Sequence, residues 1–125
     1  MSKFIMIACG GAIGALCRYW VGTTVTNLTG GIPFPYGTMT ANLLGCLLIG
    51  LLAGLDFTHK LFTLETRLLI FTGFLGAFTT FSTFSSETIL LVQSERLLYA
   101  SLYVISSVGL GLTAVWLGQR LATLF

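Results

Sequence analysis

Three long stretches of the chain contain no Asp, Glu, Lys, Arg or His: residues 19–55, 68–86 and 97–119. Only 8% of all residues are charged, whereas soluble domains carry about 25%. The mean hydropathy is +0.95. A chain with so few polar groups cannot cover a water-facing surface, so its solvent is predicted to be a lipid bilayer.

The lengths of these stretches indicate how many helices cross the membrane. A helix needs about 20 apolar residues to cross the hydrocarbon core. Residues 19–55 are too long for one helix, and the segment "NLTGGIPFPYG" (27–37) marks a loop within them. The sequence therefore predicts a single all-α membrane domain over residues 1–125, with four spans at roughly 4–26, 37–56, 66–94 and 97–121. Lys3 and the apolar run after it also fit a cleaved signal peptide, but its removal would discard a quarter of the fold.

The basic residues give little information about orientation. With four spans, both termini lie on one side of the membrane. The six cations divide four to two between the sides, with Lys3, Lys60, Arg67 and Arg120 on one and Arg18 and Arg96 on the other. Since a bias of two is weak for the positive-inside rule, the chain is compatible with insertion in both orientations.

Small residues recur four apart along the predicted helices. Such spacings let helix backbones approach closely, either within one chain or between copies. They occur at Gly10 and Gly14, Ala41 and Gly45, Gly50 and Gly54, and Ala114 and Gly118. The three cysteines show no metal-binding spacing and are interpreted as apolar fillers.

The third span contains the unusual stretch "GFLGAFTTFSTFSSE" (73–87). Gly73 and Gly76 lower helix propensity, and six hydroxyl side chains follow between residues 79 and 86. A helix broken inside a membrane survives where it faces protein or a water-filled path, and such breaks often mark ion sites. The alternative is a continuous helix whose hydroxyls bond to their own backbone, with the glycines as packing contacts.

Phenylalanines alternate with these hydroxyls at positions 78, 81 and 84. Residues three apart form a slowly turning stripe on a helix. Such a stripe ordinarily faces lipid or the core, but an aromatic ring also has a positive edge that suits a desolvated anion. The interleaved hydroxyl donors favour that second interpretation.

Polar residues on the other spans also fit an anion path. Thr38 and Asn42 share one face of the second span, although the alternative is that Asn42 bonds to the backbone of a neighbouring helix. Tyr99, Tyr103 and Ser107 are aligned four apart on the last span. Arg18 could attract anions in a vestibule or extend to the membrane interface. Glu87 is interpreted as an ordinary charge at a helix end, so no carboxylate is expected deep in a span.

Three motifs resemble the Fluc/CrcB family of fluoride channels over essentially the whole chain. They are "GAIGALCRY" (11–19), "GTMTANLLG" (37–45) and, most specifically, "GFLGAFTTFSTFS" (73–85). Ala77 departs from the second glycine that many relatives have beside Gly76.

The resemblance implies an antiparallel, dual-topology homodimer with two separate pores, which exports fluoride passively across the cell inner membrane. It implies no enzymatic activity and no nucleic-acid partner. It also implies a structural sodium ion at the dimer centre, bound by backbone carbonyls of Gly76 and Thr79. The residues that match its fluoride pore are Phe81, Phe84 and Asn42, with Ser82, Thr83 and Tyr103 as polar lining.

Two other function classes remain open. A small four-helix drug exporter would need a carboxylate in the first span, and residues 4–26 contain none. A non-transporting membrane subunit would explain the small-residue spacings but not the interleaved phenylalanines and hydroxyls.

Overall fold

Four helical spans make up the part of the chain that the computed structural model describes, residues 2–125. They are α1 (Ser2–Leu28), α2 (Tyr36–His59), a third span over Leu64–Gln93 and α6 (Leu97–Ala122). Each is long and apolar enough to cross a membrane. The prediction of an all-helical protein with four spans is therefore confirmed.

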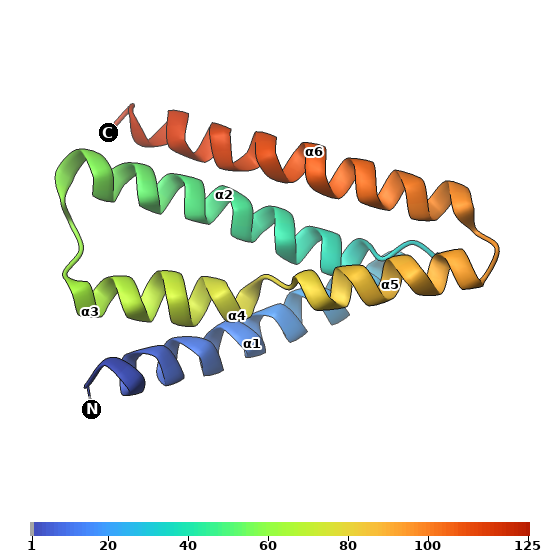
Figure 1. Cartoon of the computed structure of the whole chain (residues 1–125), viewed down its shortest axis with the longest axis horizontal. Helices are drawn as coiled ribbons and strands as arrows, with labels where there is room; N and C mark the ends of the chain where they lie inside the picture. Colours follow the sequence, from blue (N-terminus) through green and yellow to red (C-terminus); the bar gives the residue numbers. More distant parts are fainter. Residues whose placement is uncertain (1) are drawn as a thin grey trace.

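The spans run antiparallel to their neighbours in sequence, and both termini lie at the same end of the molecule (Figure 1). α2 packs along α6, while α1 packs against the first half of the third span. Most large apolar side chains are exposed. Such exposure is expected in a bilayer, because lipid tails are as apolar as these side chains and provide no driving force for burying them.

The connection between the second and third spans is shorter than the polar segment 56–67 suggested. α2 continues to His59 and helix resumes at Leu64. Asp56, at the end of α2, accepts a hydrogen bond from the Phe62 N–H at 3.0 Å and pairs with Arg67 at 2.8 Å. These two contacts tie the end of α2 to the start of the third span.

The third span is joined from several helical pieces. Its pieces are α3 (Leu64–Arg67), the π-helical segment η1 (Leu68–Leu75), α4 (Gly76–Phe78) and α5 (Phe81–Gln93). Thr79 (φ −91°, ψ 155°) and Thr80 (φ −149°, ψ 119°) lie between α4 and α5 with extended backbone. A lipid-exposed stretch of this kind would leave backbone N–H and C=O groups unsatisfied, so these groups must find hydrogen-bond partners elsewhere in the protein.

The glycines of the third span lie in its helical pieces rather than at the extended residues. Gly73 belongs to η1, and a Cβ on it would come within 2.8 Å of the Ile7 carbonyl oxygen in α1. On the facing side, Gly10 and Gly14 of α1 lie directly against the backbone of Leu69 and Phe74. Gly73 therefore lets two helices touch, which is the packing role that small residues have in membranes.

Candidate functional site

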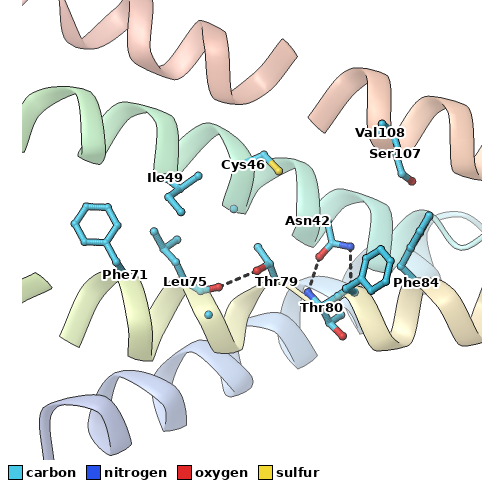
Figure 2. Close-up of a pocket in the computed structure, with 13 residues that line it drawn as sticks. Asn42, Cys46, Ile49, Phe71, Leu75, Thr79, Thr80, Phe84, Ser107 and Val108 are labelled. Carbon is cyan, nitrogen blue, oxygen red and sulfur yellow. Dashed lines mark hydrogen bonds between the residues drawn. The ribbon is translucent and has the colours of Figure 1, made fainter. Parts of the chain in front are cut away.

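Asn42 of α2 binds both backbone groups of Thr80. Its Oδ1 accepts the Thr80 N–H at 2.8 Å, and its Nδ2 donates to the Thr80 carbonyl at 3.1 Å. Figure 2 shows this pair of hydrogen bonds between α2 and the extended residues of the third span. The backbone that leaves the helix is thus satisfied by one side chain from another span, as an apolar solvent demands.

The extended residues divert two N–H groups away from their helical acceptors. In an uninterrupted helix, the N–H of Thr80 would bond to the Gly76 carbonyl and that of Thr83 to the Thr79 carbonyl. Here the Thr80 N–H goes to Asn42, and the Thr83 N–H goes to the Thr80 hydroxyl at 3.2 Å. The carbonyl oxygens of Gly76 and Thr79 are thereby released from these helical bonds.

The Thr80 hydroxyl caps the N-terminus of α5. It lies 3.0 Å from the Thr83 hydroxyl and 3.2 Å from the Ser82 hydroxyl. Ser82 and Thr83 are exposed on the surface of the single chain. The three hydroxyls therefore form one polar cluster at the point where α5 begins.

A carboxylate lies at the centre of a second polar cluster. Glu87 accepts hydrogen bonds from the Thr38 hydroxyl of α2 and the Tyr103 hydroxyl of α6, each at 2.7 Å. Tyr103 is fully buried. Thr38 and Tyr103 each have a single hydroxyl proton, and both protons are donated to Glu87 rather than to a bound ion.

Phe81 and Phe84 lie on the same side of α5 with ring centroids 5.7 Å apart. The Phe84 ring also packs on Tyr103, at 5.0 Å between centroids. Phe81 is 79% exposed, so its ring has no covering within the chain. Phe78, the first member of the predicted stripe, is instead buried against Phe74.

Two cavities meet at Thr80, which lines both. The smaller, of about 380 Å³, is the one in Figure 2 and is mostly apolar apart from Asn42, the Thr79–Thr80 pair and Ser107. It brings together five of the predicted site residues: Asn42, Gly76, Thr79, Phe81 and Phe84. The larger, of about 730 Å³, brings together Arg18, Thr38 and Thr83 with Glu87. Ser82 and Tyr103 line neither cavity.

Ser107 has a buried hydroxyl oxygen without a hydrogen-bond partner among residues 2–125. It lies on α6, at the wall of the smaller cavity. A hydroxyl in this position is costly to leave unpaired. It is therefore a further donor for a ligand in the smaller cavity.

Together these groups place N–H donors, O–H donors and aromatic ring edges on the walls of two cavities that share Thr80. Arg18 adds a positive charge at the wall of the larger cavity, where low-dielectric surroundings strengthen its field. Glu87 is the one carboxyl group that lines either cavity within residues 2–125, and two hydroxyls donate to it. The arrangement suits a small anion that must shed its water.

The sequence analysis missed two residues of this site. Glu87 is not an ordinary charge at a helix end, because it joins three spans through its carboxylate. The sequence does place Thr83 and Glu87 four apart on one face of a helix, but it does not indicate the partners of Glu87 on α2 and α6. Thr80 provides the backbone that Asn42 holds, and no local pattern distinguishes it from Thr79.

A family model for CrcB-like proteins, described as "CrcB-like protein, Camphor Resistance (CrcB)", matches residues 5–119. Curated relatives match over almost their whole length and carry the name fluoride-specific ion channel FluC. The relative from Oceanobacillus iheyensis is 43% identical over 98% of this chain and 92% of its own. One from Nitratidesulfovibrio vulgaris is 43% identical over 99% of both chains, and one from Acidobacterium capsulatum is 47% identical over 94% of this chain and 93% of its own.

Proposed function

The chain belongs to the CrcB-like family of multi-pass membrane ion channels, which are not enzymes, and on that premise we propose that it conducts fluoride passively across the cell inner membrane. The observation that carries the proposal is the meeting of Asn42, the extended Thr80 backbone and the Phe84 ring at one cavity between the spans. Export follows in a cell whose potential is negative inside, because that potential drives anions outward.

Each part of the path replaces some of the water that fluoride loses. Arg18 raises the anion concentration in the larger cavity. The hydroxyls of Thr83 and Ser107 then offer donors. Between these two hydroxyls, the second N–H of the Asn42 amide and the ring edges of Phe81 and Phe84 present positively polarised hydrogens to an ion. None of these hydrogens acts as an acceptor. Small size and high charge density make fluoride the halide that gains most from such close donors.

Ser82, Thr38 and Tyr103 are proposed to act around this path. Ser82 adds a hydroxyl to the cluster at the start of α5. Thr38 and Tyr103 hold the Glu87 carboxylate by two charge-assisted hydrogen bonds, which fixes its charge at one place beside the larger cavity. An ion that moves past Thr83 then passes a carboxylate that is held in one position by two hydrogen bonds.

The working unit is proposed to be an inverted homodimer with two separate fluoride pathways. Gly76 and Phe81 are exposed on the open side of the smaller cavity, where a second copy would complete the wall. The weak cation bias between the two ends of the spans supports insertion in both orientations.

A structural sodium ion fits the donor set at the extended residues. The carbonyl oxygens of Gly76 and Thr79 are released from helical bonds, and two inverted copies would supply four of them. Hard cations prefer oxygen ligands, and neutral carbonyls suit a single positive charge. The ion would offset the partial negative charge of these carbonyl oxygens where the two copies meet.

A release assay on three cargoes separates this function from the alternatives. Proteoliposomes are loaded with fluoride, chloride or a cationic dye, and an ionophore balances charge throughout. Fluoride release alone is expected. Release of the dye would indicate an exporter, and retention of all three cargoes by correctly folded protein would indicate a non-transporting subunit.

Dual insertion predicts that about half of the chains have both termini outside the cell and about half have both termini inside. A single cysteine replaces Thr123, near the C-terminus, in a background that lacks Cys9, Cys17 and Cys46. An impermeant thiol reagent applied to intact cells is then expected to label about half of the protein, and all of it after the cells are opened.

Labelling of nearly all or nearly none of the intact-cell sample would mean one orientation, and the inverted pair would have to be abandoned. A matched variant with two lysines added between residues 56 and 67 should shift the labelled fraction and lower fluoride release. A copy biased the opposite way should restore release when both are expressed together.

A further inference from the structure

Phe34 lies in the short connection between α1 and α2, outside both cavities, yet its ring contacts the aromatic cluster on α6. It packs edge-on against Tyr103, with centroids 5.5 Å apart and planes at 77°. It also packs on Tyr99 at 6.3 Å and Tyr36 at 4.6 Å. A loop residue thus contacts the tyrosine that donates to Glu87.

The backbone of Phe34 is unusually constrained for a loop. Pro33 precedes Phe34 and Pro35 follows it. The pyrrolidine ring of Pro35 restricts the backbone conformation of Phe34. Its N–H bonds to the Ile32 carbonyl at 2.8 Å, and its carbonyl accepts the Tyr36 N–H at 2.8 Å. A ring mounted on such a segment is a fixed wall for whatever packs on it.

Tyr103 depends on ring packing for its position. Its hydroxyl bonds to Glu87, and its ring is held between neighbours that include Phe84 and Phe34. A tyrosine that loses one aromatic neighbour gains freedom about its side-chain torsions. That freedom would let its hydroxyl move out of hydrogen-bond distance from the carboxylate.

We propose that Phe34 is a positioning residue: its ring fixes Tyr103 so that the Tyr103 hydroxyl reaches Glu87 beside the fluoride path. This inference rests on the proposed fluoride conduction for its effect on flux. Its effect on the Tyr103–Glu87 hydrogen bond does not depend on that function.

A double-mutant cycle in proteoliposomes tests the inference. Phe34→Leu is expected to slow fluoride release by roughly three- to tenfold, the size that one aromatic pair corresponds to. In a Tyr103→Phe background, the same change is expected to slow release by less than about twofold, since the hydroxyl it positions is gone. Phe34→Tyr keeps a ring and is expected to retain at least about half of the wild-type rate.

Phe62→Leu is the matched control. Phe62 lies in the connection at the other end of the molecule and also makes an edge-on pair, with Phe71 at 6.0 Å. Its loss removes comparable packing without touching Tyr103, so release within about twofold of wild type is expected. If Phe34 were merely structural, Phe34→Leu would slow release equally in both backgrounds, and that result would overturn the inference.

The tyrosine Raman doublet supplies a readout without flux. The difference spectrum between wild type and Tyr103→Phe is expected to show a strongly donating hydroxyl, and Phe34→Leu is expected to lose that signature. Retention of the signature in Phe34→Leu would overturn the inference, whatever the flux. Absence of fluoride release from the wild type would instead refute only the proposed function.

Discussion

Protein with Asn42→Asp is expected to release fluoride from liposomes at least about tenfold more slowly than wild type. An aspartate keeps an acceptor for the Thr80 N–H but places a second carboxylate oxygen where Nδ2 donates to the Thr80 carbonyl. An unpaired carbonyl in an apolar setting costs about 1–3 kcal/mol. The carboxylate also puts a negative charge beside the proposed anion path.

Asn42→Ala separates these two causes. It removes both hydrogen bonds to Thr80 but adds no charge, and it is expected to slow release by a similar factor because the extended backbone is no longer held. Near-normal release from Asn42→Ala would show that the amide does not hold the path open. Near-normal release from both variants would place the path elsewhere.

Phe81→Ile and Phe84→Ile are each expected to slow fluoride release about tenfold or more, because isoleucine keeps bulk but lacks the positive ring edge. Phe81 is informative because it is 79% exposed in the single chain. Its replacement removes little packing within the chain, so lost release would report the path rather than the fold. The proposed dimer should persist in both variants by size-exclusion chromatography in detergent.

Phe74→Ile is the control for these variants. Phe74 stacks on Phe78 with centroids 5.7 Å apart, and it lines neither cavity. Release within about twofold of wild type is expected once the folded fraction is matched. A loss as large as that of Phe84→Ile would mean that any change in ring packing on this span blocks conduction.

The four spans could be predicted because the hydrocarbon thickness imposes a length on every apolar run. Both the loop at residues 27–37 and the charges near position 60 lie close to the observed helix ends. The ends moved by a few residues where side-chain contacts extend a helix. Asp56 is an example, since its bonds to Phe62 and Arg67 hold the end of α2 in place.

The position of the extended residues followed from a tertiary contact that local propensity does not reveal. The low helix propensity of Gly73 and Gly76 drew attention to the right stretch, but the extended pair is Thr79 and Thr80. Asn42, 38 residues away in sequence, provides the hydrogen bonds that stabilise it. The alternative considered for Asn42, a bond to a neighbouring backbone, is present in the structure as its two hydrogen bonds to Thr80.

Glu87 and Phe34 escaped the sequence analysis for a related reason. The partners of Glu87 come from α2 and α6, and no pattern within the third span indicates them. Phe34 lies in a loop, where helical periodicity carries no information about which ring it meets. In both cases the role arises only when distant spans are brought together.

The central claim, passive conduction of the fluoride ion itself, is tested most directly by release from liposomes loaded with potassium fluoride. Fluoride that leaves through a channel carries charge, so its efflux soon stops unless another ion compensates that charge. Fluoride should therefore stay inside until valinomycin lets potassium follow, and then leave rapidly while chloride is retained. Release that is equally fast without valinomycin would indicate an electroneutral process. No fluoride release after valinomycin, from protein shown to be folded, would contradict the account.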